Sequence, residues 1–154
     1  MSTARGLPLA LRTAFLAMHR QTNASLARSG CTADQFVLLG LLVREDAVTQ
    51  QDLVRRASSD PNTVRAMLVL LEKRGLVTRV NHRSDGRARS VTLTEKGRRL
   101  HRRQLADTDP LRTRMAALFR PEEVKALVDF LARISEALSP PKREHARKGK
   151  GEPR

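Results

Sequence analysis

Apolar residues recur at helical spacing in the first part of the chain, from about Pro8 to Ala27. The apolar positions are Leu11, Phe15, Met18 and Leu26. Residues three or four apart share one face of a helix, so this segment is predicted to be an amphipathic helix that packs against another element. Gly30 and Cys31 interrupt the pattern and end the predicted helix.

Polar residues mark the starts of the helices that follow. Thr32 has a glutamine three residues later, the spacing of a capping box, and an apolar segment comes next. Thr49 is predicted to cap a short helix that ends near Ala57. Asp60 is predicted to cap the next helix, with Pro61 at its first position, where a missing N–H costs little.

The helix after Asp60 has a clear buried stripe. Its apolar positions are Val64, Met67, Leu68 and Leu71. Gly75 follows Arg74 and is predicted to end the helix. Because a short polar turn, Ser58 to Asp60, joins this helix to the one before it, the pair has the layout of a helix-turn-helix.

After the helix-turn-helix the apolar pattern changes from helical spacing to alternation. The alternation covers Val77 to Asn81 and again Ser90 to Leu93, which predicts two β-strands. Asp85-Gly86 lies between them and is a strong signal for a hairpin turn. A basic β-hairpin directly after a helix-turn-helix is predicted to be a wing.

The C-terminal part returns to helical spacing. Thr94 is predicted to cap a helix, and Asp109-Pro110 to kink or break it. Pro121 begins a last helix with an apolar stripe of nearly heptad spacing. The stripe consists of Val124, Leu127, Val128, Leu131, Ile134 and Leu138. One chain offers too little cover for this stripe and for that of the first helix, so a partner chain is predicted.

The charge of the chain reduces the number of partner classes to consider. The chain carries 30 Lys and Arg against 16 Asp and Glu, a net charge of +14 that favours polyanions. Aromatic residues make up 3% of it, without Trp or Tyr, which disfavours an interfacial membrane helix and base stacking on single strands. Double-stranded DNA is therefore the predicted partner. The basic segment after Leu138 either adds nonspecific DNA affinity or is simply solvated.

The segment from Asp60 to Gly97 resembles the multiple antibiotic resistance regulator (MarR) family of transcription factors. The resemblance rests on Leu71-Glu72-Lys73-Arg74-Gly75-Leu76-Val77, on Asp85-x-Arg87 and on Val91-x-Leu93-Thr94-x-x-Gly97. It implies a homodimer in which the N- and C-terminal helices interlock. It also implies that Arg87 enters a minor groove, that Asp85 stabilises the wing, and that a small aromatic or lipophilic effector, or an oxidant, releases DNA.

The predicted organisation follows this order of elements. We expect a mainly α fold with a small β-hairpin wing: a winged helix-turn-helix DNA-binding lobe plus a helical dimerisation region. Residues 1–31 are predicted to form the N-terminal dimerisation helix and residues 32–97 the DNA-binding lobe. Residues 98–138 are predicted to form the C-terminal dimerisation helices, and residues 139–154 a disordered basic tail.

The candidate DNA contacts lie in the turn, in the second helix of the helix-turn-helix and in the wing. They are Ser58, Ser59, Asn62, Thr63, Arg65, Ala66, Arg83, Arg87 and Arg89. In a major groove Arg65 suits guanine, Asn62 suits adenine, and Thr63 suits a phosphate or a thymine methyl. The two serines and the helix N-terminus suit phosphates. A narrow minor groove attracts an inserted arginine, which favours Arg87 as a contact. The alternative is an ordinary solvated surface, a choice that also stays open for Lys73 and Arg79.

No catalytic or metal-binding constellation is evident in the sequence. The histidines lack paired spacing for zinc, and there is no nucleophile elbow or phosphate-binding glycine loop, so we expect no enzyme activity, metal or cofactor. Cys31 is the only cysteine, which excludes an internal disulfide and favours a reducing, cytoplasmic location. We expect it to be a buried small residue rather than a redox sensor, since no thiolate-stabilising partner lies near it in the sequence.

The predicted function is therefore a sequence-specific regulator of transcription that binds double-stranded DNA. The favoured form is a repressor that occupies a palindromic operator as a homodimer and is released by a small-molecule ligand. A nonspecific architectural DNA-binding protein is the main alternative, because charge alone would permit it. The third hypothesis is a protein-interaction module. Alanine substitutions at Arg65 and Arg87 that leave the affinity for DNA unchanged would favour it.

Overall fold

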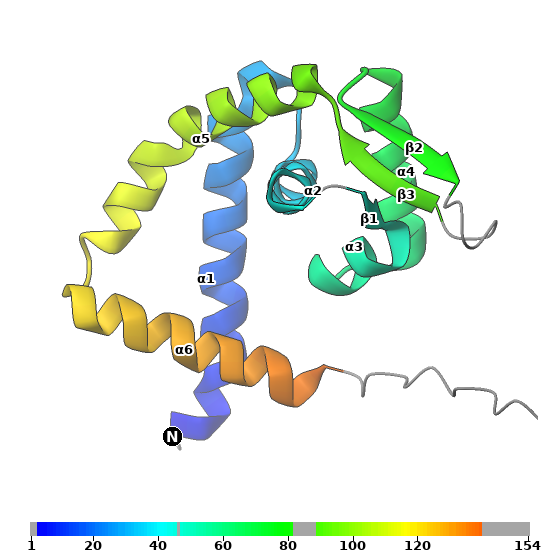
Figure 1. Ribbon diagram of the computed structural model, residues 1–154. Helices are drawn as coiled ribbons and strands as arrows, with labels where there is room; N and C mark the ends of the chain where they lie inside the picture. The colour runs from blue at the N-terminus through cyan, green and yellow to red at the C-terminus, as the bar shows by residue number, and fades with distance from the viewer. Residues whose placement is uncertain (1–2, 46, 82–88, 140–154) are drawn as a thin grey trace, which may run out of the picture. The chain divides into compact units, whose positions relative to one another are not determined.

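The computed structural model describes residues 3–45, 47–81 and 89–139 of the chain (Figure 1). These residues are mainly helical, with one small antiparallel sheet, as predicted. The elements are α1 (Thr3–Leu26), the 3-10 turn η1 (Ala27–Ser29), α2 (Ala33–Arg44), β1 (Val48–Thr49), α3 (Gln50–Arg56), α4 (Pro61–Lys73), β2 (Val77–Asn81), β3 (Arg89–Leu93), α5 (Glu95–Ala116) and α6 (Pro121–Leu138).

Helix α2 is the central helix of the winged lobe and appears end-on in Figure 1, between α1 and the sheet. Its capping box is confirmed: Gln35 N donates to Thr32 Oγ1 at 3.2 Å, and Thr32 N donates to Gln35 Oε1 at 3.1 Å. Its leucines lie in one core with side chains from α3, α4, the strands and α5. That core includes Leu38, Leu39, Leu42, Leu53, Val64, Leu68, Leu71, Leu76, Val77, Val91, Leu93 and Leu100.

Helices α3 and α4 form the predicted helix-turn-helix. Thr49 caps α3, its Oγ1 accepting the Asp52 N–H at 3.1 Å. Asp60 caps α4, with the Thr63 N–H donating to its carboxylate at 2.9 Å. Gly75 follows α4 with a φ of 69°, the left-handed conformation in which a side chain is strained. The predicted starts and the predicted end are therefore confirmed.

The sheet has three strands in the order β1-β3-β2. β2 and β3 pair antiparallel from Val77↔Leu93 to Asn81↔Arg89, which confirms the two wing strands. β1 pairs with the other edge of β3 through Val48↔Val91. β1 was not predicted, because a strand of two residues is too short to show alternation.

Helix α5 is not broken at Asp109-Pro110, contrary to one of the two outcomes predicted there. It runs through Pro110 to Ala116, and its ribbon curves along its length in Figure 1. Side chains supply donors to the preceding turn: Thr108 Oγ1 and Arg112 Nη2 donate to the Leu105 carbonyl at 3.2 and 3.0 Å. The N–H that Pro110 lacks would have donated to the Ala106 carbonyl, and a helix accommodates such a loss by bending rather than by ending.

Helix α1 begins at Thr3, earlier than the predicted start near Pro8. Pro8 lies inside the helix. Proline is tolerated at this point because only about one turn precedes it, so little backbone hydrogen bonding is lost. Among the described residues, no single helix is long and apolar enough to cross a membrane; the bent pair of residues 5–29 and 33–44 passes by composition and includes the core helix α2.

The chain divides into two compact units, one ending at Arg114 and one beginning at Met115. The first contains α1 and the whole winged lobe. The second contains α6, in which none of the residues is buried. The domain boundaries predicted after residues 31, 97 and 138 stay predictions.

Arg74 connects the end of α4 to the end of α1. Its guanidinium donates to the carbonyls of Ser29 at 2.7 Å and Gly30 at 2.8 Å, and to the Cys31 sulfur at 3.0 Å. Carbonyls at a helix end lack backbone partners, so the guanidinium satisfies groups that α1 and η1 leave open. Cys31 is buried, as expected, and its partner was missed because 43 residues separate it from Arg74.

Candidate nucleic-acid interface

One face of α4 presents the predicted recognition residues to solvent. The exposed side chains are Asn62, Thr63, Arg65 and Ala66. On the opposite face Val64, Leu68 and Leu71 are buried in the core. A recognition helix requires this rotation, because its base-reading side chains must project into the groove while its apolar stripe holds the lobe together. The predicted orientation is therefore present, and the contacts with DNA remain predictions.

The N-terminus of α4 is organised by Asp60, which was predicted to cap the helix rather than to touch DNA. Its carboxylate accepts hydrogen bonds from both the hydroxyl and the N–H of Thr63. These hydrogen bonds, the hydroxyl's first, lower the pKa of Asp60. The Thr63 hydroxyl proton is thereby committed to Asp60, which leaves the methyl group and an oxygen lone pair of Thr63 for a nucleic acid.

The turn before α4 contains Ser58 and Ser59. Ser58 has a φ of 49°, and the N–H groups of Ser58 and Ser59 donate to the carbonyls of Arg55 at 3.2 Å and Val54 at 3.1 Å. Both serine N–H groups are therefore used inside the turn. Their hydroxyls are what remains for a phosphate, that of Ser58 exposed and that of Ser59 half-buried.

Of the predicted wing residues, Arg89 lies among those the structure describes. It is exposed at the start of β3, opposite Asn81 of β2. Arg83, Asp85 and Arg87 lie outside the described residues. The minor-groove contact of Arg87 and the wing-stabilising role of Asp85 stay predictions.

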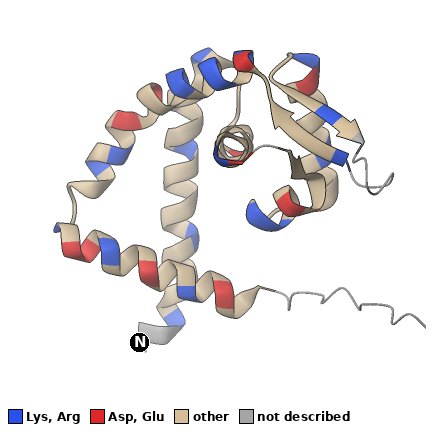
Figure 2. Ribbon diagram, in the orientation of Figure 1, with Lys and Arg blue, Asp and Glu red and all other residues tan. Residues whose placement is uncertain are grey.

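Some arginines of this lobe are held by carboxylates and have a structural role, whereas others remain available to contact DNA. Arg79 is 13% exposed and donates to Glu72 through Nε at 2.9 Å, which ties β2 to α4 and lowers the pKa of Glu72. Arg56 holds Glu45 through two hydrogen bonds of 2.9 and 3.0 Å. Arg65 makes no such pair with any other described residue, and Figure 2 shows Lys and Arg distributed over this lobe. Arg65 is thus free to meet a base, whereas Arg79 has a structural role.

A cluster of buried polar side chains lies between α2, α5 and the end of α1. His101 stacks on Phe36 with ring centroids 5.2 Å apart, and burial is the main cause that lowers the pKa of His101. Gln104 is fully buried; its Nε2 donates to Ser29 Oγ at 3.1 Å, but its Oε1 has no hydrogen-bond partner. An unpaired buried acceptor costs about 1–3 kcal/mol, so a bound donor would be favourable there.

Sequence reasoning missed this polar cluster. His101, Gln104 and Thr108 recur at helical spacing on α5, and all three are buried. Polar residues on a buried stripe were the available signal, but arginines occupy the neighbouring positions and mask it in a hydropathy pattern. Phe36 and Ser29 come from other elements, and no local pattern predicts that they meet α5.

Comparisons with known proteins agree with this geometry. A family model described as the MarR family matches residues 31–88. The chain is 32% identical over 108 residues to the HTH-type transcriptional regulator YdgJ of Bacillus subtilis, covering 70% of this chain and 66% of that protein. It is 35% identical over 83 residues to the HTH-type transcriptional repressor Rv2887 of Mycobacterium tuberculosis, covering 54% of this chain and 60% of the relative. It is 31% identical over 146 residues to the regulator TtmR of Methylorubrum extorquens, covering 95% of this chain and 71% of the relative.

Solved structures share the fold over most of the chain. The transcriptional repressor CouR bound to a 23-mer DNA duplex has a TM-score of 0.77 and 29% identity, covering 84% of this chain and 92% of that one. BpsR of Bordetella bronchiseptica, whose DNA binding is regulated by 6-hydroxynicotinic acid, has a TM-score of 0.79 and 26% identity, covering 88% of this chain and 97% of that one.

Proposed function

The chain belongs to the MarR family, and from this membership we propose that it is a sequence-specific regulator of transcription that binds double-stranded DNA. The observation that carries the proposal is the outward face of α4. Asn62 and Arg65 are exposed there, and Arg65 has no ion pair among the described residues. These side-chain types read adenine and guanine in the major groove.

We propose further that the chain acts as a homodimer on a palindromic operator. The apolar stripe of α6 supports this, since Val128 and Leu131 are 59% and 40% exposed. α1 also exposes Leu9 and Phe15, at 68% and 53%. Two-fold pairing through such faces would present two α4 helices to half-sites about one helical turn apart.

We also propose that the regulator is a repressor, acts in the cytoplasm, and releases DNA when a small aromatic or lipophilic effector binds. The polar cluster on α5 supports the last point, because the unpaired Gln104 Oε1 would accept a hydrogen bond from an effector hydroxyl while Phe36 offers an aromatic surface. Titration of small aromatic acids against the preformed complex with DNA tests this release.

The central test is operator binding by the full-length chain. After selection of a preferred duplex from random sequences, Arg65→Ala is expected to weaken its binding about 5- to 150-fold, since a bidentate base contact is worth about 1–3 kcal/mol. Fluorescence anisotropy at fixed salt measures the change. Arg28→Ala is the matched control, because Arg28 is also an exposed arginine but lies in η1, and its effect should stay within about twofold.

The net charge of +14 favours one alternative, a nonspecific architectural DNA-binding protein. For that function the selected and scrambled duplexes would bind equally, and both arginine variants would weaken binding to the same small extent. Sequence-specific regulation predicts a preference of about a thousandfold or more for the selected duplex.

A further inference from the structure

The outer face of α5 carries a basic cavity that is widely open to solvent and that the proposed DNA contacts do not use. Its volume is about 530 Å³. The lining residues are Arg99, Arg102, Arg103 and Ala106. Residues three or four apart project from one side of a helix, so these arginines form a single stripe. Leu100 and Gln104 of the same helix are buried in the lobe, which leaves the arginine stripe facing solvent.

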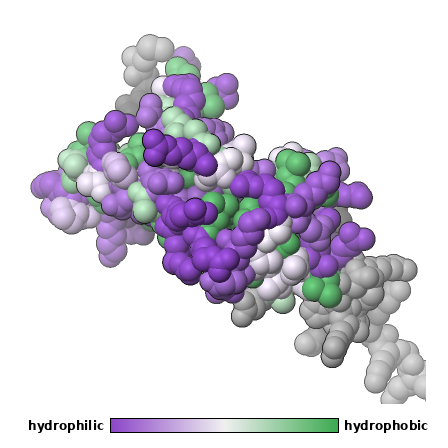
Figure 3. All heavy atoms as spheres, turned by 90° about the horizontal axis from the view of Figure 1, so that it is seen from above, coloured by the Kyte–Doolittle hydropathy of each residue, from purple (hydrophilic) through white to green (hydrophobic). Residues whose placement is uncertain are grey.

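The cavity lies at the opposite end of α4 from the proposed DNA contacts. The start of α5 is fixed to the end of α4, because Lys96 Nζ donates to the Arg74 carbonyl at 2.6 Å and Thr94 Oγ1 donates to the Gly75 carbonyl at 2.7 Å. α4 has 13 residues, and a helix of that length spans about 20 Å. Figure 1 shows that the start of α5 lies near the end of α4, away from the start of α4, and Figure 3 shows hydrophilic side chains over the upper face. DNA bound at the start of α4 would therefore leave these arginines available to another anion.

The lining suits phosphate groups in particular. A guanidinium presents a planar pair of donors that matches phosphate oxygens, and all the charged lining residues are arginines rather than lysines. Glu95 lies beside the stripe, 3.5 Å from Arg102 and 3.8 Å from Arg99. These pairs are long and well exposed to solvent, so they contribute little and a phosphate can compete with them.

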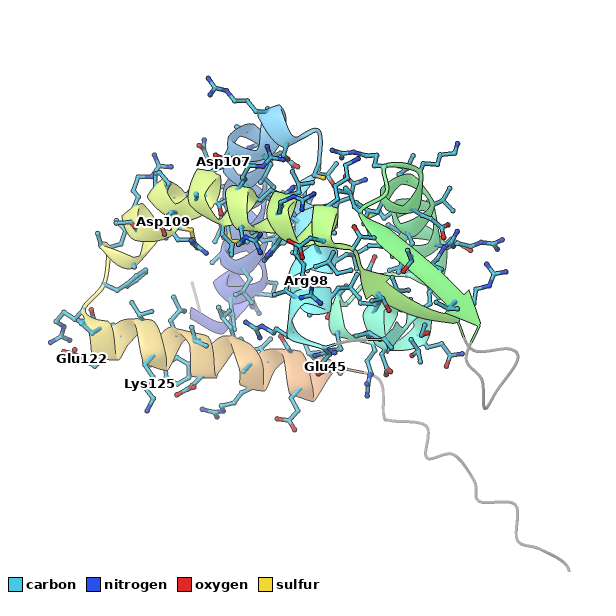
Figure 4. All side chains as sticks on the ribbon, turned by 45° about the horizontal axis from the view of Figure 1, so that its top comes forward. Glu45, Arg98, Asp107, Asp109, Glu122 and Lys125 are labelled. Carbon is cyan, nitrogen blue, oxygen red and sulfur yellow. The ribbon has the colours of Figure 1, made fainter. Side chains whose placement is uncertain are left out.

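Other carboxylates near the stripe do not neutralise it. Asp107 and Asp109, both labelled in Figure 4, come from the following turn of α5 and do not line the cavity. Asp109 instead accepts a hydrogen bond from Arg112 at 2.9 Å. The cavity therefore keeps an excess of positive charge.

We propose that this face of α5 binds the phosphate groups of a small organic di- or triphosphate ester, such as a nucleotide. The cavity is open, so it would hold the charged phosphate groups and leave the rest of the molecule in solvent. The site goes beyond the proposed function. Its existence does not depend on whether the chain binds DNA, so the two can fail separately.

The test is isothermal titration of the full-length chain with ATP and, separately, with inorganic tripolyphosphate at about 0.1 M salt, where long-range attraction is screened. Saturable binding of both probes, with one site per chain, is expected. The double variant Arg102→Gln/Arg103→Gln should weaken both at least tenfold. The control Arg44→Gln/Arg55→Gln removes the same charge from exposed positions outside α5 and should change neither more than about twofold.

A true phosphate site differs from simple attraction to a basic protein in how the variants behave. The unmodified chain and the two double variants are compared by circular dichroism, and Arg102→Gln/Arg103→Gln should fold because both arginines are exposed. Equal weakening by both double variants would overturn the proposal, since it would show attraction to net charge alone. Binding of polyglutamate through Arg102 and Arg103, without saturable binding of either phosphate probe, would also overturn it and assign the face to an acidic protein.

Discussion

At the scale of single residues, Gly97 is the most constrained position for the packing of α5. A Cβ on Gly97 would lie 2.2 Å from the Leu76 carbonyl oxygen and 2.6 Å from Leu93 Cδ1. The Gly97 N–H also donates to Thr94 Oγ1 at 3.0 Å, which holds the first turn of the helix in place. Neither the strand nor the helix can move away freely, so only glycine fits.

Gly97→Ala is expected to destabilise the protein by about 3 kcal/mol, because overpacking forces backbone to shift. Urea unfolding followed by circular dichroism measures the loss. Gly6→Ala is the control: nothing lies within 4 Å of a Cβ there, and alanine should stabilise α1 by about 0.5–1 kcal/mol. Equal midpoints for Gly97→Ala and the unmodified chain would contradict this packing.

His101 gives the fold a dependence on pH. Burial first, and then the charge of Arg112, lower the pKa of His101 below its usual 6.5. As pH falls through 6.5 the unfolded chain binds a proton before the folded one does, so stability declines from about pH 7 towards the lowered pKa. His101→Gln should flatten this part of the stability curve. His19→Gln, at a half-buried histidine of α1, should leave the decline in place, and thermal unfolding from pH 5 to 8 compares the three proteins.

Capping residues were the most predictable part of the chain. Thr32, Thr49, Asp60 and Thr94 all accept the expected backbone N–H. A cap and its partner lie three residues apart, so the sequence itself contains the whole interaction. The bond from Arg74 to Cys31 and the stacking of His101 on Phe36 join distant elements, and no spacing rule reaches them.

At the scale of elements, the start of α4 depends on Asp60. Asp60→Ala frees the Thr63 N–H and should lower the melting temperature, whereas Asp60→Asn keeps an acceptor and should lower it less. Because hydrogen bonding lowers the pKa of Asp60, its contribution is full above the unfolded pKa and is lost as pH falls below it. Thermal melts at pH 7 and pH 3 test both statements, and identical melts for the alanine and asparagine variants would contradict the capping role.

Elements with a clear repeat of apolar residues were predicted from the sequence. Elements that form only because a distant segment packs beside them were not. The buried stripe of α4 and the alternation of β2 and β3 are repeated over enough residues to identify each element. β1 is too short for a period and exists because β3 offers it an edge. Asp109-Pro110 was predicted to kink or break α5, and the helix instead curves and continues through Pro110, because a bend accommodates a single proline.

At the scale of the whole molecule, the apolar stripe of α6 should control assembly. Leu131→Glu places a charge in that stripe and is expected to convert the proposed dimer to monomer at micromolar concentration, because a buried unpaired charge is costly. Light scattering after size exclusion measures the mass. Arg133→Glu introduces the same residue on the opposite face of α6 and should leave the dimer intact. A monomeric unmodified chain would refute the dimer itself.

The sequence predicted the orientation of the recognition helix but not the polar cluster behind it. The orientation follows from α4 alone, because its apolar and polar residues lie on opposite faces of the helix. The polar cluster requires α1, α2 and α5 to meet, so it depends on packing between segments far apart in the chain. The arginine stripe of α5 is visible in the sequence, yet its distance from the DNA-reading end of α4 becomes evident only in the fold.

The hydrogen bonds of Arg74 join the end of α4 to the end of α1. Arg74 directly follows the last residue of α4, and its side chain holds the carbonyls of Ser29 and Gly30 at the end of α1 and η1. Ser29 also accepts a hydrogen bond from Gln104 through its hydroxyl, so the end of α1, the end of α4 and the middle of α5 are joined at a single residue.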